Sequence, residues 1–252
     1  MKAIILAAGR GIRMRPLTDH TPKPLLKVRG RALIEWHLLA LAEGGVREVV
    51  INTAWLEDQI PAALGDGARW GLKIRYSMEG REHGGALETA GGIATALPLL
   101  VDSDRDVFWV VSGDIYAPEF KFDAALAQRF SVSGLQAHLW LVPNPPFHVK
   151  GDFGLDGEGH GLADSVGPDG LTYTYSNFAL CRASLVSGVA PGTKAALGPL
   201  LFAGMRRRMI TAEVYSGQWE NVGTPEQLAA LNGPSACELG SLPLDGEGLG
   251  KR

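Results

Sequence analysis

The sequence predicts a single α/β domain built on a mostly parallel sheet. Residues 3–8 form a short apolar run that ends at Gly9, as is typical of a strand covered on both faces. Apolar residues recur at helical spacing over residues 31–43, and a second strand-like run follows at residues 48–53. A strand, a helix and a strand in this order predict a right-handed parallel βαβ unit. A chain of 252 residues with 46% hydrophobic content is long enough for one sizeable core.

Apolar runs alternating with helical patterns continue to residue 232. Strands are expected at residues 72–77, 106–111, 135–142, 172–181 and 210–215. Helices are expected at residues 55–64, 121–130, 195–205 and 227–231. The Gly-rich residues 78–93 are expected to enter a loop, and the proline-rich residues 143–148 to be irregular. We assign residues 1–232 to the folded domain. Residues 233–252 are rich in Gly, Pro and Ser without periodicity, which indicates a flexible tail.

Composition and charge exclude several classes of partner. A net charge of −3 and a pI near 6.1 give no broad basic surface, so nucleic acid is not expected as a partner. No apolar stretch approaches the ~18 residues of a membrane-spanning helix, and the N-terminal run is too short for a signal peptide. The two cysteines, Cys181 and Cys237, form no metal-binding or redox motif. We therefore expect a cytoplasmic protein that contacts no membrane, either as a monomer or as a homo-oligomer.

The segment after the first strand is expected to handle phosphate. Gly9 and Gly11 let the backbone bring N–H groups close to an anion. Asp19 is the one acid within residues 9–27, and that segment holds five cations: Arg10, Arg13, Arg15, Lys23 and Lys27. Met14 stands where a dinucleotide fingerprint has its third glycine, and no Lys-Ser or Lys-Thr pair completes a P-loop, so both of those motifs are excluded.

A longer pattern covers this segment from Leu6 to Leu25, L-A-A-G-x-G-x-R-M-x-P-L-T-x-x-x-P-K-P-L. It resembles the signature of the sugar-1-phosphate nucleotidylyltransferases, also called NDP-sugar pyrophosphorylases. The similarity continues over about nine tenths of the chain, at residues 33–42, 64–77, 87–93, 112–114 and 219–226. This resemblance implies a Rossmann-like three-layer sandwich with a mostly parallel mixed sheet, of the nucleotide-diphospho-sugar transferase type. It also implies transfer of a nucleotidyl group from a nucleoside triphosphate to a sugar 1-phosphate, with release of pyrophosphate.

The resemblance also implies which residues bind the nucleotide. They are Leu6, Ala7, Ala8, Gly9, Gly11, Ile12, Arg13, Lys23 and Glu79. The planar guanidinium of Arg13 suits the β- and γ-phosphates, and the point charge of Lys23 suits a place between the α-phosphate and the sugar phosphate. Pro22 and Pro24 stiffen the backbone around Lys23, although a solvated lysine in a proline-rich turn would have the same local sequence. Glu79 would read the base, but its carboxylate could accept from uracil or from guanine, or it could be an exposed acid.

A magnesium ion and a sugar pocket follow from the same resemblance. Asp114 comes after an apolar strand and Gly113, a placement suited to a Mg²⁺ ligand or simply to a turn cap. Asn221 stands where most members carry a second aspartate, and its carbonyl can ligate Mg²⁺ but brings no charge. The catalytic set is thus expected to be Arg13, Lys23 and Asp114. Positions that look like substrate-binding ones are Ser112, Asp152, Ser176, Asn177 and Lys194.

Three functions remain open. Glu79-Gly80, the LETAGG motif, the KGDF motif and the short C-terminal region most resemble members that transfer uridylyl from UTP to N-acetylmuramic acid 1-phosphate in cell-wall sugar recycling. The same chemistry with GTP and mannose or heptose 1-phosphate is one alternative. Another alternative, suggested by Asn221, is a catalytically silent regulatory protein that binds nucleotide sugars. The phosphate nucleophile of the reaction is already ionised, so no general base is needed, and positioning and charge neutralisation carry the catalysis.

Overall fold

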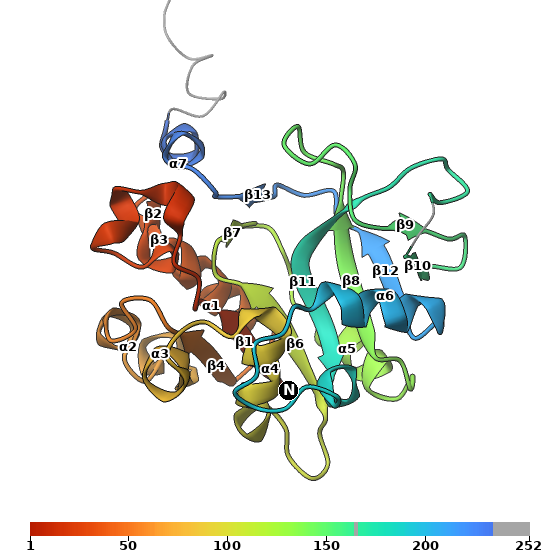
Figure 1. Cartoon of the computed structure of the whole chain (residues 1–252), viewed down its shortest axis with the longest axis horizontal. Coiled ribbons are helices and arrows are strands. Elements are labelled where there is room, and N and C mark those ends of the chain that lie inside the picture. Colours follow the sequence, from red (N-terminus) through yellow and green to blue (C-terminus); the bar gives the residue numbers. More distant parts are fainter. Residues whose placement is uncertain (164–165, 234–252) are drawn as a thin grey trace, which may run out of the picture.

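A seven-stranded mixed sheet forms the centre of the protein, which is described as a computed structural model over residues 1–163 and 166–233 (Figure 1). The strands run in the spatial order β12, β8, β11, β6, β1, β4 and β5. Their bounds are β1 (Lys2–Leu6), β4 (Glu48–Thr53), β5 (Lys73–Met78), β6 (Val107–Ser112), β8 (Ala137–Val142), β11 (Thr174–Arg182) and β12 (Ile210–Val214). Within this sheet β11 is antiparallel to both its neighbours, while the other pairs are parallel. The mostly parallel mixed sheet is therefore confirmed.

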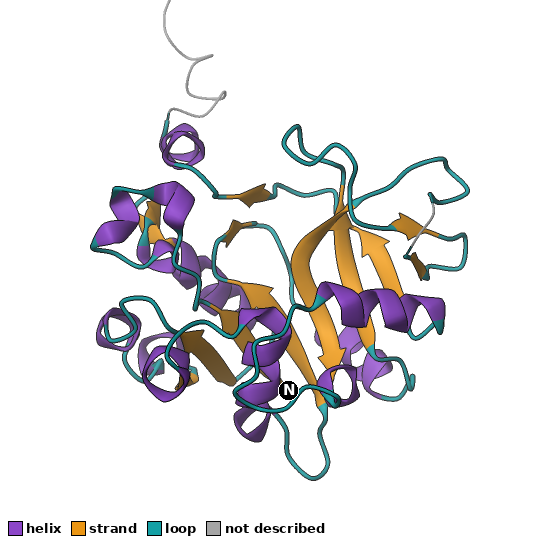
Figure 2. Ribbon diagram, viewed as in Figure 1, coloured by secondary structure: helices purple, strands orange, loops and turns teal. Residues whose placement is uncertain are grey.

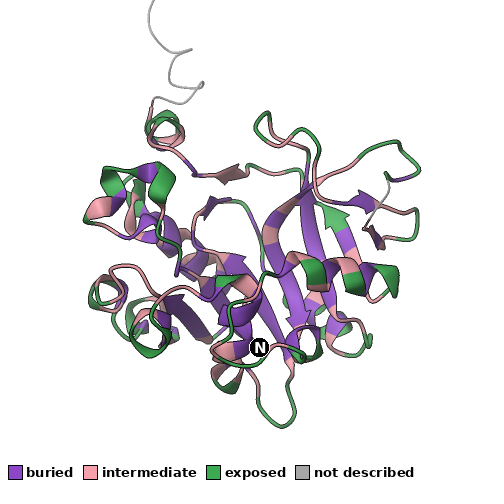
Figure 3. Cartoon of the chain, viewed as in Figure 1, coloured by how far each residue is buried: buried purple, intermediate pink, exposed green. Residues whose placement is uncertain are grey.

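Helices cover both faces of the sheet and make three layers (Figure 2). Helices α1 (Leu33–Glu43), α2 (Gln59–Leu64) and α5 (Ala124–Ser131) pack on one face. Helices α4 (Glu88–Leu100) and α6 (Gly198–Arg206) pack on the other. Two apolar clusters lie between these layers, and the strands are buried along most of their length (Figure 3). Strands covered on both faces explain why the sequence shows continuous apolar runs rather than alternation.

Short elements surround the carboxyl edge of the sheet. They are the ladder of β2 (Lys27–Val28) with β3 (Arg31–Ala32), that of β7 (Ile115–Tyr116) with β13 (Glu220–Asn221), that of β9 (Gly154–Leu155) with β10 (Gly161–Leu162), and helices α3 (Glu79–His83) and α7 (Pro225–Asn232). Of these, only α7 was expected from the sequence. Residues 78–93, expected to enter a loop, instead form α3 and the start of α4, separated at Gly84 and Gly85, which both have positive φ.

A third, small apolar cluster ties this edge together. Met14, Val28, Tyr116, Val222 and Leu228 meet there, although they come from five segments spread over the chain. The cluster therefore fixes the glycine-rich N-terminal loop against the β7–β13 ladder and α7.

Gly233, just after α7, is the last residue that the structure describes. The tail expected at residues 233–252 otherwise lies outside the described residues, and its boundary stays a prediction. Over the described ranges, the helices are all too short or too polar to cross a membrane.

Candidate active site

A glycine with a left-handed backbone shapes the loop at the end of β1. Gly11 has φ 61°, and a Cβ there would lie 2.9 Å from the Cγ2 of Thr18. The Thr18 hydroxyl donates a 2.8 Å hydrogen bond to the carbonyl oxygen of Gly11. The loop is thus folded back tightly on itself, and a larger residue at position 11 would force it open.

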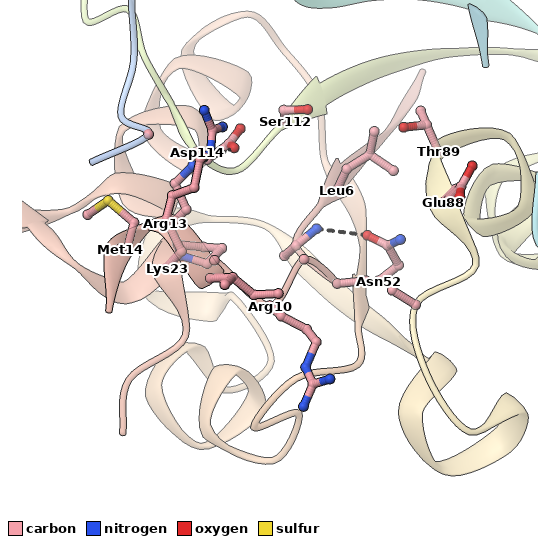
Figure 4. Close-up of a pocket in the computed structure, with 18 of the residues that line it drawn as sticks. Leu6, Arg10, Arg13, Met14, Lys23, Asn52, Glu88, Thr89, Ser112 and Asp114 are labelled. Atoms are coloured by element: carbon pink, nitrogen blue, oxygen red, sulfur yellow. Dashed lines mark hydrogen bonds and ion pairs between the residues drawn. The ribbon is translucent and has the colours of Figure 1, made fainter. Parts of the chain in front are cut away.

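This loop forms one wall of a cleft of about 550 Å³ at the carboxyl edge of β1 and β6 (Figure 4). Parallel α/β sheets place their ligands at this edge. Eleven of the predicted site residues line the cleft: Leu6, Ala7, Ala8, Gly9, Gly11, Ile12, Arg13, Lys23, Ser112, Asp114 and Lys194. Figure 4 shows Arg13, Lys23 and Asp114 grouped at one end, with Glu88 and Thr89 of α4 at the other.

Lys23 and Asp114 form an ion pair at the first end of the cleft. Lys23 begins a short 3-10 helix after Pro22 and is 7% exposed, so its ammonium is held rather than solvated. Its Nζ lies 2.8 Å from Asp114 Oδ2. Asp114 is brought there by Gly113, whose N–H donates a 2.9 Å bond to the Leu6 carbonyl and so joins the ends of β6 and β1. The solvated-lysine alternative for Lys23 is therefore wrong.

Arg13 approaches the same end from the N-terminal loop. A Cβ built on Gly223 would lie 3.5 Å from the Arg13 Cζ, so the guanidinium rests against the backbone that follows β13. Within the described residues Arg13 makes no ion pair, whereas Arg15 two positions on is paired with Asp19 at 3.0 Å. The charge of Arg13 is thus available to an anion in the cleft.

Asn221, predicted as the second Mg²⁺ ligand, does not line the cleft. It pairs with Ile115 in the β7–β13 ladder, and the next residue donates a 3.1 Å backbone bond to the Asp114 carbonyl. Its Oδ1 is buried and has no hydrogen-bond partner among the described residues. A buried carbonyl oxygen without a donor is of the type that Mg²⁺ prefers as a ligand.

The other end of the cleft is formed by the start of α4. Glu88 has φ 60°, an uncommon backbone conformation for a residue with a Cβ, and its carboxylate lies 3.6 Å from the Lys194 ammonium. The Gly91 N–H and the Ala90 N–H both donate to the Ala195 carbonyl, which docks residues 193–195 on the helix. Gly91 has no room for a side chain, because a Cβ there would overlap the Thr193 carbonyl. Gly91, the first of the two glycines in LETAGG, therefore lets residues 193–195 lie close enough to α4 for Lys194 to line the cleft.

Besides Asn221, four predicted residues do not line the cleft. Glu79 is fully buried and bonded to Asn52 and to the backbone of Leu87, so it presents no surface to a base. Ser176 is also fully buried, and its hydroxyl donates to the Trp140 carbonyl. The predictions that these two side chains bind ligand are corrected, because neither faces the cleft.

Asp152 and Asn177 do not line the cleft. Oδ2 of Asp152 accepts a 2.8 Å bond from the Tyr175 N–H, and the sugar-binding role of Asp152 stays a prediction. Asn177, at φ 65°, sits where β11 departs from regular pairing. Asn177 directly precedes Phe178, which pairs with Val111, the neighbour of the cleft residue Ser112.

Sequence reasoning missed Asn52 at the site and named Arg10 only as one of the cations of the N-terminal loop. Asn52 lines the cleft from the end of β4, and its side chain accepts a 2.8 Å bond from the Ala7 N–H. Arg10 lines the cleft too and stacks over Trp55, with 4.6 Å from Cζ to the ring centre. The only available signal for Asn52 was its place near the carboxyl end of a predicted strand. Nothing local linked Arg10 to Trp55.

His37 lies under the loop that carries Asp114. It is buried on α1 against Phe178, with ring centres 5.6 Å apart. Burial lowers the pKa of His37 to about 4, against smaller opposing effects of nearby backbone and of Asp114. This histidine is therefore neutral at physiological pH and adds no charge beneath the site.

The sequence of this chain is similar to that of known nucleotidyl transferases. A sequence model of the nucleotidyl transferase family matches residues 2–144. An N-acetylmuramate alpha-1-phosphate uridylyltransferase of Neisseria meningitidis is 47% identical over 225 residues, covering 89% of this chain and 94% of that protein. A protein of the same name from Caulobacter vibrioides is 30% identical and covers 90% and 94%.

A solved structure shows the same fold. It is described as a glucose-1-phosphate thymidylyltransferase from Bacillus anthracis in complex with a sucrose, with a TM-score of 0.75 and 20% identity over 92% of this chain and 94% of that one. The family match spans more than half of the chain and includes β1, the glycine-rich loop, Lys23 and Asp114. The chain therefore belongs to the nucleotidyl transferase family.

Proposed function

We propose that this protein transfers a uridylyl group from UTP to N-acetylmuramic acid 1-phosphate, forming a UDP-sugar and pyrophosphate in cell-wall sugar recycling. Support for the acceptor comes from the two relatives that carry this activity in their names and match nearly the whole chain. A cytoplasmic location is part of the proposal.

One observation carries the reaction type: the cleft holds Lys23 paired with Asp114, with Arg13 beside them. Two anionic substrates must approach within bonding distance, and two cations at one end of a cleft offset their repulsion. Fixed charges of this kind cost no reorganisation during the reaction.

Each residue then has a distinct role. Arg13 would hold the β- and γ-phosphates and the departing pyrophosphate, because its fork matches paired phosphate oxygens. Lys23, anchored between two prolines, would lie between the α-phosphate and the incoming sugar phosphate. The sugar phosphate oxygen attacks the α-phosphorus in line, a bond to the β-phosphate oxygen breaks, and no proton has to move. Positioning is thus the main task of the chain.

Asp114 and Asn221 would hold a Mg²⁺ ion, which when bound supplies positive charge to the phosphoryl oxygens. Asp114 is half-exposed at the cleft, and the unpaired Oδ1 of Asn221 is a second oxygen of the right type. One carboxylate and one neutral amide bind the ion less tightly than two carboxylates would, so the substrate phosphates must contribute more of the affinity for the ion.

Replacing Asn221 by aspartate tests this metal assignment. We expect the Mg²⁺ concentration for half-maximal turnover to fall by about tenfold, because a second negative ligand is added. Without metal the variant should melt at a lower temperature, since two carboxylates repel each other, and added Mg²⁺ should reverse the loss. The measurement is a Mg²⁺ titration of turnover and of melting temperature after chelator treatment. An unchanged Mg²⁺ requirement in Asn221→Asp would mean that position 221 is not a ligand.

Gln227 is expected to hold the backbone on which Arg13 rests. Its Oε1 accepts from the Gly223 N–H at 2.7 Å and the Thr224 N–H at 3.0 Å. We expect Gln227→Ala to raise the KM for the triphosphate by about three- to tenfold, with a smaller change in kcat.

Thr224→Ala is the matched control for Gln227→Ala. It removes the other half of the same capping box but leaves the bond from the Gly223 N–H intact. Both variants should lose similar stability. Equal KM values in the two would show that Gln227 acts only as a helix cap and does not position the backbone under Arg13.

The experiment for the function is pyrophosphate release across a matrix of nucleoside triphosphates and sugar 1-phosphates. UTP with N-acetylmuramic acid 1-phosphate is expected to turn over fastest. Preferred turnover of GTP with mannose or heptose 1-phosphate would replace the proposed substrates but keep the chemistry. Retained nucleotide binding with no turnover in any combination would instead support a regulatory protein.

A further inference from the structure

A fully buried carboxylate lies behind the cleft with no role in the proposed reaction. Glu79 follows β5 at the start of α3 and is 0% exposed. Taking a carboxylate out of water is costly unless hydrogen bonds satisfy its oxygens. The groups that hydrogen-bond to the Glu79 carboxylate therefore indicate its role.

Both oxygens of Glu79 are used, one for each wall of the cleft. Oε1 accepts a 2.6 Å bond from the Asn52 Nδ2, and the Asn52 Oδ1 accepts a 2.8 Å bond from the Ala7 N–H. Oε2 accepts a 2.8 Å bond from the Leu87 N–H. Ala7 belongs to the wall made by the glycine-rich loop, and Leu87 directly precedes Glu88 in the wall made by α4. One carboxylate thus connects the two walls.

The polarity of this chain of bonds is fixed by the backbone. The Ala7 N–H can only donate, so Asn52 presents its carbonyl oxygen there and its amide nitrogen to Glu79. The Leu87 N–H likewise needs an acceptor. Burial raises the pKa of Glu79, while the bonds from Leu87 and Asn52 lower it.

Little space is left for these groups to shift. A Cβ on Gly92 of α4 would lie 2.6 Å from Glu79 Oε1 and 2.7 Å from Asn52 Nδ2. The helix therefore presses directly on the pair, and a change at either residue must move a wall of the cleft.

We propose that Glu79 and Asn52 are positioning residues that set the spacing of the two walls and so the affinity for the nucleotide. The identity of that nucleotide rests on the function proposed above. Neither residue has to touch the reacting phosphates for this effect.

The chain offers a polarity swap as a test. In Glu79→Gln an amide nitrogen must face either the Asn52 amide or the Leu87 N–H, and two donors then meet. In Asn52→Asp two carboxylates meet. In the double variant Glu79→Gln/Asn52→Asp all three bonds are restored, with inverted polarity only in the bond between positions 79 and 52. The new amide at position 79 donates to the new carboxylate at position 52 and still accepts from the Leu87 N–H. The net charge of the double variant equals that of the wild type.

We expect each single variant to raise the Kd for UTP, measured by calorimetry with Mg²⁺, by about tenfold or more, and the double variant to return within about threefold of wild type. KM for UTP should follow Kd, while kcat changes less. Glu82→Gln is the matched control, because it makes the same charge change at an exposed position of α3. It should leave the Kd unchanged.

Amide hydrogen exchange gives a readout that needs no substrate. The Ala7 and Leu87 amides should exchange faster in each single variant and recover in the double variant. If wild-type protein does not bind UTP, the proposed substrate fails while the exchange result still tests the wall spacing.

Three outcomes would overturn the inference. One is a folded Glu79→Gln protein with wild-type Kd and only a lower melting temperature, as expected of a purely structural residue. Another is a folded double variant that binds no better than the single ones. Where a single variant does not fold, the double variant decides alone: wild-type affinity supports the proposal, and weakened affinity in a folded protein removes it.

Discussion

Lys23→Ala should lower turnover by about 10²–10³-fold while the protein keeps its fold. The ammonium belongs to a residue that is 7% exposed and lies 2.8 Å from Asp114, so its charge is held in one place at this end of the cleft. Losing one preorganised group that stabilises developing charge typically costs about this much. Turnover is measured as pyrophosphate release at saturating substrates, and circular dichroism checks the fold.

Lys27→Ala is the control for this prediction. It removes the same charge four residues later, from an exposed side chain of β2 outside the cleft. We expect its turnover to stay within about twofold of wild type, because screened surface charges contribute little. A folded Lys23→Ala protein that turns over as fast as Lys27→Ala would remove Lys23 from the mechanism.

The fold could be predicted because its signals are local. The runs at residues 3–8 and 48–53 became β1 and β4, and their parallel pairing followed from the helix between them. Boundaries shifted where tertiary contacts compete with pattern. The helix expected from residue 195 begins at Gly198, since Ala195 is hydrogen-bonded to Leu87 and to the start of α4 instead. The β7–β13 ladder was missed because each of its strands has two residues and no periodicity.

The end of the cleft that holds Arg13, Lys23 and Asp114 was predictable for the same reason. Arg13 and Lys23 lie in one short segment, and Asp114 comes two residues after the end of a recognisable strand. Glu79 was recognised as part of a family motif, but the prediction that its side chain contacts the base was wrong. Its burial depends on Asn52, Leu87 and Gly92, and no pattern in one sequence reveals that these residues meet. Long-range polar contacts of this kind are visible only in the folded chain.

Replacing Arg13 by alanine should raise the KM for the triphosphate and lower kcat, for a loss in kcat/KM of about 10²–10³-fold. Its guanidinium makes no ion pair within the described residues and lies against Gly223, so substrate phosphates gain its charge without first breaking a salt bridge. Both bound triphosphate and departing pyrophosphate lose a partner, which is why both kinetic constants should respond.

Arg15→Ala separates this effect from the general loss of charge in the same loop. Arg15 is two residues away and exposed, and its pairing with Asp19 at 3.0 Å already neutralises it. Removing it changes the net charge by the same amount, so the electrostatic field far from the protein changes equally in both variants. Kinetics of Arg15→Ala that match those of Arg13→Ala would mean that the loop acts through its overall charge. A loss confined to Arg13→Ala requires a direct contact between that guanidinium and the phosphates, because of these two arginines only Arg13 lines the cleft.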